Sequence, residues 1–151
     1  MATFAAIPDF IESQMEGETD LRIATNIKMA LSNIAPGSES SPTTTSGNGI
    51  LANVTQISYT NYSDDMGTDR VLENTTSDES GGTYKYDADN IVITASGGTL
   101  ATFRYIYLFD DNGTTPTDPL IGVWDHGSAI SLATGESATI TWNASGIFTI
   151  A

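Results

Sequence analysis

The stretch that most constrains the fold of this chain is TFRYIYLFDD, Thr102 to Asp111. Nearly every position before its two aspartates is apolar or aromatic. A strand that has no polar face is buried on both sides, as happens at the centre of a sheet. The stretch therefore predicts a central β-strand, with one face toward the core and the other toward a second subunit. Arg104 within this strand would need a carboxylate partner.

Other strand-like segments, separated by turn residues, recur roughly every ten residues along the chain. This pattern predicts a single all-β domain over residues 1–151, an antiparallel sandwich or a jelly-roll-like barrel. For the segments Leu21–Ala24 and Ile27–Ser32, a helix is the alternative to two strands, because Ile23, Ile27 and Leu31 recur at four-residue intervals. The predicted strands are Leu21–Ala24, Ile27–Ser32, Val54–Tyr59, Arg70–Asn74, Thr83–Tyr86, Asn90–Ala95, Leu100–Phe109, Leu120–Trp124, Ser128–Leu132, Ala138–Trp142 and Ile147–Ile150.

Four segments are expected to differ from this pattern. Residues 1–17 form an N-terminal helical segment, in which FAAIPDFIESQM allows one short helix with Asp9 or Pro8 near its start and Gly17 at its end. Residues 35–49 (APGSESSPTTTSGNG) are too polar to order themselves, which predicts a long mobile loop or an arm that orders against a partner. Ser77–Gly82 (SDESGG) is expected to be a polar loop, and the Asp and Asn residues in Tyr86–Ile91 predict a tight hairpin.

The charge balance excludes several classes of partner. Five Lys and Arg residues stand against 19 Asp and Glu, a formal net charge of −14. Such a surface repels phosphate backbones and anionic lipid, so we expect neither nucleic acid nor a membrane as partner. The absence of cysteine excludes disulfides, thiolate metal sites and Cys nucleophiles. The N-terminus lacks the basic and apolar regions of a signal peptide, which favours intracellular synthesis and leaves the final location open.

The segment DDNGTTPTDPLIGVWDHGS, residues 110–128, contains the residue types of a hydrolase triad in Asp125, His126 and Ser128. Successive side chains of a strand point to opposite faces, so Asp125 and His126 are expected to diverge, with Ser128 beyond a Gly turn. The sequence also lacks a G-x-S-x-G motif that would present a serine nucleophile. We therefore expect no catalytic residues and no enzyme activity here.

The same segment raises the possibility of calcium. Asp110, Asp111 and Asp118 offer the oxygen ligands that hard cations prefer, as do Asp64, Asp65 and Asp69 earlier in the chain. Neither segment matches the calcium-loop motif, and Asp is also common in turns because its side chain accepts hydrogen bonds from local backbone. The favoured interpretation is turns and no cofactor, with calcium at Asp110, Asp111 and Asp118 as the alternative.

Aromatic side chains suggest a second kind of site. Trp124, Trp142 and the tyrosines at 59, 62, 84 and 86 could stack on sugar rings. The alternating pattern around Trp142 in ATITWNASGIFTI favours packing in the core or an interface. Carbohydrate binding is therefore an alternative to a purely structural role.

Three stretches resemble a family of small structural proteins from the virions of tailed bacteriophages. GETDLRIATNIKMAL (residues 17–31) is similar to the family's acidic G-x-x-D-L followed by an I-K-x-A-L strand. RYIYLFDDNGTTPTDPLIGVWDHGSAISL (104–132) is similar to its R-Y-x-x-L-x-D, variable turn, P-L-I-G and aromatic-D-x-G, and GESATITWNASGIFTI (135–150) resembles its closing segment. The long polar segment SESSPTTTSGNG departs from the family pattern.

This resemblance implies a non-enzymatic head decoration, or cement, protein. Such a protein is made in the bacterial cytoplasm and lies on the outer capsid surface, where it commonly trimerises and bridges subunits of the major capsid protein. A tail- or fibre-associated protein that binds host-surface carbohydrate is the alternative. We expect the interface with the capsid or with other subunits to be formed by Phe103, Tyr105, Tyr107, Phe109, Trp124 and Trp142.

Overall fold

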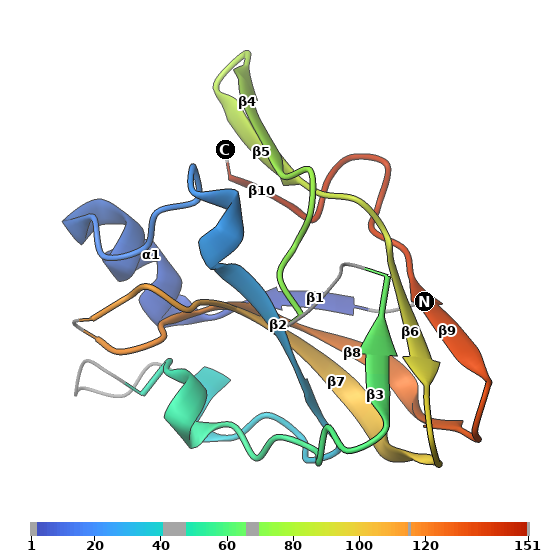
Figure 1. Ribbon diagram of the computed structural model, residues 1–151. Helices are drawn as coiled ribbons and strands as arrows, with labels where there is room; N and C mark the ends of the chain where they lie inside the picture. The colour runs from blue at the N-terminus through green and yellow to red at the C-terminus, as the bar shows by residue number, and fades with distance from the viewer. Residues whose placement is uncertain (1–2, 41–47, 66–69, 115, 151) are drawn as a thin grey trace.

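The computed structural model describes residues 3–40, 48–65, 70–114 and 116–150, and it is composed mostly of antiparallel strands (Figure 1). The predicted all-β class is therefore confirmed. The largest sheet has the strand order β1-β8-β7-β2. Its strands are β1 (Thr3–Ala6), β2 (Ile27–Ser32), β7 (Leu100–Asp110) and β8 (Leu120–Leu132).

Two three-stranded sheets cover the large sheet and give a sandwich-like arrangement (Figure 1). One has the order β3-β6-β9, with β3 (Tyr62–Asp64), β6 (Ile91–Ala95) and β9 (Ser137–Ile140). The other has the order β10-β5-β4, with β4 (Thr76–Ser80), β5 (Thr83–Asp87) and β10 (Phe148–Ile150).

Aromatic contacts join the large sheet to the smaller ones. The rings of Trp124 on β8 and Trp142 after β9 have centroids 5.3 Å apart. Phe148 on β10 stacks on Phe4 of β1 at 6.1 Å and on Tyr86 of β5 at 5.4 Å. Buried apolar side chains from Ile7 to Phe148 form one hydrophobic cluster around these contacts, so the sheets share one core.

β7 occupies an inner position of the large sheet, between β8 and β2, which confirms the prediction of a central strand. Its residues from Tyr105 to Asp110 are all buried, because the sheet has neighbours on both faces at this end. The pairing with β8 shifts register between Tyr105↔Asp125 and Phe103↔Ile130. Four residues of β8, 126–129, therefore lie opposite Arg104 alone, in a β-bulge that re-aims their side chains.

The N-terminal helix α1 (Pro8–Glu16) begins at Pro8, one of the two residues predicted near its start, and Phe4 at the head of the same segment belongs to β1, which pairs with β8. Pro8 suits the first turn, since the amide it lacks would have no partner there. Gly17 ends the helix with φ 75°, as predicted. No helix in the described part of the chain is long and apolar enough to cross a membrane.

Three predicted strands were wrong. Leu21–Ala24 is a turn, since the Asp20 carboxylate accepts hydrogen bonds from both the amide and the guanidinium of Arg22, and a 3₁₀ helix, Ala24–Asn26, follows. Val54–Tyr59 touches β2 through a single bridge, because the Tyr59 hydroxyl accepts the Leu31 amide hydrogen bond that a strand carbonyl would otherwise take. Arg70–Asn74 also makes only one bridge, and its two ends have positive φ angles of 61° and 49°.

Four further expectations need correction. Residues 77–82 are no loop: Ser77–Ser80 belongs to β4, and Gly81 and Gly82, with φ 63° and 86°, turn the chain into β5. Residues 86–91 form no hairpin, since β5 and β6 belong to different sheets. Here Asp89 and Asn90 accept hydrogen bonds from Trp142 instead.

The segments Leu120–Trp124 and Ser128–Leu132 are one strand, β8, because the bulge passes through Gly127 at φ 88°. Ile27–Ser32 is a strand, so the helical alternative was wrong there.

The predicted mobile loop, residues 35–49, is described only at its two ends, and its residues 41–47 lie outside the described part. Short 3₁₀ helices, Ser38–Ser40 and Leu51–Asn53, lie at its start and just after it. Glu39 is buried, and its carboxylate accepts hydrogen bonds from the Tyr107 hydroxyl at 2.9 Å and from the Gly37 amide at 3.0 Å. The Gly49 amide donates to Asp9 at 2.8 Å. Both described ends are therefore fixed to the body of the domain.

Candidate functional site

The three residues of the triad pattern do not form a catalytic relay. Asp125 makes a two-pronged ion pair with Arg104, at 2.7 and 2.8 Å, so Arg104 has the carboxylate partner that the sequence predicted. The Arg104 guanidinium and the Gly127 amide hold the pKa of Asp125 at about 2. The carboxylate is thus occupied by a cation on β7 and does not orient the neighbouring imidazole.

His126 and Ser128 do meet, although Ser128 was expected to lie apart, beyond a Gly turn. The Nδ1 atom of His126 lies 3.0 Å from the Ser128 carbonyl oxygen and 3.4 Å from its Oγ. The contact arises because the bulge turns both side chains the same way. Both residues are exposed, and neither lines one of the hollows described below.

The predicted calcium ligands serve other partners. Asp110 is buried, and its carboxylate accepts hydrogen bonds from the amides of Asp20 and Asn112, each at 2.9 Å. Asp111 lies 2.6 Å from the Lys28 ammonium group. Burial, and then the charge of Asp111, raise the pKa of Asp118.

The earlier acidic segment is also engaged in hydrogen bonds. Asp64 accepts from the Tyr62 hydroxyl and Asp65 from the Val92 amide, while Asp69 lies outside the described residues. Among the residues described, no three acidic or His side chains come together in a group that could hold a metal ion.

All six residues expected at an interface are buried within this one chain, each at most 8% exposed. Phe103 and Tyr107 are fully buried, so a partner could reach them only by opening the core. The six are Phe103, Tyr105, Tyr107, Phe109, Trp124 and Trp142.

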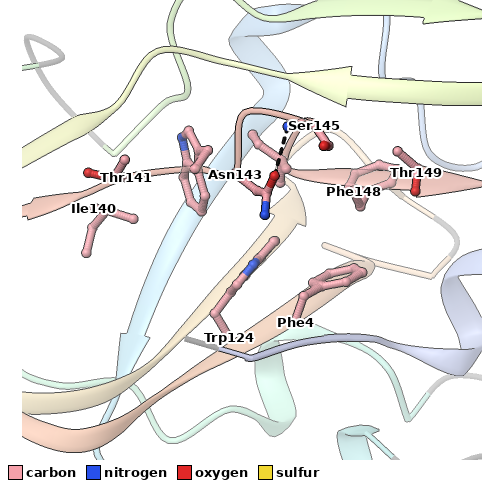
Figure 2. A pocket seen from close by; sticks show the side chains of 11 residues that line it. Phe4, Trp124, Ile140, Thr141, Asn143, Ser145, Phe148 and Thr149 are labelled. Atoms are coloured by element: carbon pink, nitrogen blue, oxygen red, sulfur yellow. Dashed lines mark hydrogen bonds between the residues drawn. The ribbon is translucent and has the colours of Figure 1, made fainter. Parts of the chain in front are cut away.

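Trp124 and Trp142 differ from the other four residues because, although buried, they also line an open hollow of about 730 Å³ (Figure 2). Phe4 completes this aromatic wall, with its ring 4.7 Å from that of Trp124. Residues 140–149, from the end of β9 to β10, form the opposite side. We call this feature the aromatic hollow.

The rim of the aromatic hollow is a rigid turn. The Asn143 side-chain oxygen accepts the Ser145 amide at 2.8 Å, and the Gly146 amide donates to the Asn143 carbonyl at 2.8 Å. Gly146 has φ 105°, and a Cβ there would lie 2.8 Å from the Tyr86 carbonyl oxygen, so the turn packs directly on β5. Figure 2 shows the Asn143 amide nitrogen on the side that faces Trp124.

The tyrosines proposed for sugar stacking lie elsewhere. Tyr59 and Tyr62 pack edge to face at 5.5 Å, and the Arg70 guanidinium lies 3.7 Å from the centre of the Tyr59 ring. Tyr86 is fully buried. Tyr84 borders a smaller hollow of about 370 Å³ together with Ile150 and residues at the end of α1.

The second surface feature is the β4–β5 hairpin, which projects from the body of the domain (Figure 1). All five residues of β4 are exposed, and within the described chain β4 pairs with β5 alone. Its outer edge therefore presents free backbone amides and carbonyls. At the root of the hairpin, buried Tyr86 stacks on Phe148 and fixes β5 to the core.

Comparisons with known proteins add no relative: no family model, curated protein or solved structure matches this chain. Sequence reasoning identified Trp124 and Trp142 but missed Phe4, Asn143 and Phe148 as their neighbours. Phe4 lies ahead of the predicted helix start at Pro8 or Asp9, in a segment with no strand pattern, and Asn143 lies in ATITWNASGIFTI, where only Trp142 was singled out. No local pattern indicated that the two ends of the chain meet.

Proposed function

We propose that this protein is a non-enzymatic structural component of a phage virion that binds the outer capsid surface and bridges subunits of the major capsid protein. In this role it acts as a homo-oligomer, with a trimer as the favoured form. The proposal begins from the resemblance of residues 17–31, 104–132 and 135–150 to virion structural proteins.

The projecting β4–β5 hairpin is the observation that carries the proposal. A strand edge without a partner can accept a strand from a neighbouring protein, whose main-chain hydrogen bonds then give affinity. Asp78 and Glu79 place two negative charges on this strand. A capsid segment that pairs here would therefore be extended and would carry basic side chains.

The acidic surface fits the same role. A net charge of −14 disfavours contact with packaged DNA, so the protein would compete for the capsid shell and not for the genome. Many copies on a lattice also multiply weak single contacts, because each bound copy raises the effective concentration of its neighbours.

The experiment is co-sedimentation of the purified full chain with expanded capsids that lack it. The proposal predicts saturable binding at a fixed ratio of copies to capsid subunits. Asp78→Lys combined with Glu79→Lys should weaken this binding at least tenfold, because it reverses the charge of the free edge.

The matched control is Glu12→Lys combined with Glu16→Lys, which makes the same charge change on exposed positions of α1. It should leave binding within a factor of about two of the unmodified protein. Equal losses in the two variants would show that net charge, and not the hairpin, governs binding. An unmodified protein that stays in the supernatant would refute the proposed function.

A further inference from the structure

The aromatic hollow has a composition that stands apart from the rest of the chain. None of its eleven lining residues is charged, although 19 of the 151 residues are Asp or Glu. Its walls are the aromatic rings of Phe4, Trp124, Trp142 and Phe148, and its rim carries hydroxyl and amide groups. A lining without charged groups offers an ionic ligand no ion pair, so a cation could be held only through the faces of the aromatic rings. The hydroxyl and amide groups of the rim instead suit a neutral ligand that carries hydroxyl groups of its own.

The rim provides hydrogen-bonding groups that the fold leaves available. Asn143 uses its side-chain oxygen to hold the turn. Its amide nitrogen donates no hydrogen bond to another described residue and lies on the side facing Trp124 (Figure 2). Thr141, Ser145 and Thr149 are exposed beside it and bring hydroxyl groups to the same rim. Both hydroxyl and amide groups pair well with an alcohol.

We propose that the aromatic hollow is a binding site for a neutral sugar unit of a glycan. The apolar face of a pyranose ring packs on aromatic carbon, while its hydroxyl groups need donors and acceptors at the edge. The hollow offers the two together, with an indole wall and the Asn143 amide opposite it. Its volume of about 730 Å³ lies within the range of roughly 300–1,000 Å³ that small-molecule sites occupy.

The site is also built before the ligand arrives. The Trp142 indole nitrogen donates to the Asp89 carbonyl at 2.9 Å, so the orientation of this ring is fixed. The rim turn is held by its own hydrogen bonds. A preorganised site loses little conformational entropy on binding, which favours recognition of a small ligand. The inference does not depend on capsid binding.

The test is NMR titration of the full chain, observed through its two tryptophan indole signals, with Trp124→Phe assigning them. The probes are glucose, galactose, mannose, N-acetylglucosamine, maltose and lactose, with 3′-sialyllactose as the anionic counterpart of lactose. We expect at least one neutral sugar to shift the Trp124 signal in a saturable way. 3′-Sialyllactose, which is anionic, should bind more weakly than lactose, since the surrounding chain is strongly acidic.

Asn143→Asp is the decisive variant, because the carboxylate still accepts the Ser145 amide while the amide donor is lost. It should weaken binding about tenfold, whereas Asn33→Asp, the same change at an exposed position outside the hollow, should leave binding unchanged. If Asn143→Asp does not fold, Trp124→Phe should still reduce the affinity several-fold by shrinking the aromatic wall.

Three results would overturn the inference. The Trp124 signal could stay fixed with all six neutral sugars, or Asn143→Asp could bind the sugar as tightly as the unmodified chain. Alternatively, the Trp124 signal could respond to capsid protein and to none of the sugars. That result would assign the hollow to an apolar side chain of a protein partner. The first two results do not bear on whether the protein sediments with capsids.

Discussion

The strands β7 and β4 stand at opposite extremes of this molecule. Both are antiparallel strands in sheets of the same domain. From Tyr105 to Asp110, β7 is buried at every position, and it has a strand neighbour on each side. All five residues of β4 are exposed, and one of its edges has no partner among the described residues.

The difference separates residues that specify the fold from residues that the fold presents. Burial of apolar surface explains the aliphatic and aromatic side chains of β7, as it does for any central strand. Nothing in the core explains β4, which contributes almost no apolar surface to it. Natural proteins usually shorten, cover or charge such an edge. An edge that projects from the body and carries acidic side chains is suited to meet a partner.

The largest expected effect on stability comes from truncating β7. Phe103→Ala should lower the free energy of unfolding by about 3–5 kcal/mol, because a fully buried ring leaves a cavity that the sheets cannot close. Chemical denaturation of the two proteins measures the difference. Ser77→Ala in β4 is the comparison and should change stability by less than about 0.5 kcal/mol. Similar losses at both positions would break the contrast between the strands.

A smaller effect is expected from one hydroxyl of β7. Tyr107→Phe removes the hydrogen bond to the buried Glu39 carboxylate and should cost about 1–3 kcal/mol in unfolding free energy. Tyr62→Phe deletes the same atom beside Asp64, which is only half-buried, and should cost less. A Tyr107→Phe protein as stable as the parent would show that Glu39 does not fix the start of the 35–49 segment to the core.

The ion pair where β7 meets the bulge of β8 should have a weaker, pH-dependent effect. The pKa of Asp125 in the folded protein is about 2, below its ordinary value of 3.8. Its contribution to stability is therefore present above pH 3.8 and is lost as the pH falls toward 2. Asp125→Asn should flatten the fall in stability over this window, measured by thermal unfolding at successive pH values. An unchanged acid limb would mean that the pair with Arg104 does not persist in solution.

The smallest effect on stability is expected at β4 itself. The double substitution Asp78→Lys and Glu79→Lys should change the unfolding free energy by less than about 1 kcal/mol, since both side chains are exposed. It removes only the exposed hydrogen bond from the Gly82 amide to Glu79 and the opposite charge across from Lys85. The same protein should lose most of its affinity for capsids. Denaturation and co-sedimentation of one preparation measure both quantities. A protein that is strongly destabilised would make β4 part of the fold and not a presented surface.

The strands that local pattern predicted well are those whose side chains face the core. β5, β6, β7 and most of β8 follow from runs of Ile, Val, Tyr and Phe, and the pairing of Arg104 with a carboxylate follows from the cost of an unpaired charge. β4 was missed because SDES has the composition of a loop, and only its pairing with β5 makes it a strand.

The candidate sites were harder to predict, because they depend on contacts between distant segments. The aromatic hollow forms only if the rings of Phe4 and Phe148, which are 144 positions apart in sequence, stack on each other. The aromatic residues of β7 were expected at an interface because a strand without a polar face needs cover on both sides. The chain itself supplies that cover, since the aromatic residues of β7 belong to one buried cluster with residues of the smaller sheets.

The most direct test of the proposed function is cryo-electron microscopy of expanded capsids incubated with the purified full chain. The account predicts added density at regular lattice positions on the outer surface, with the β4–β5 hairpin in contact with a capsid subunit. Capsids without added density, or density confined to the tail or its attachment point, would contradict it.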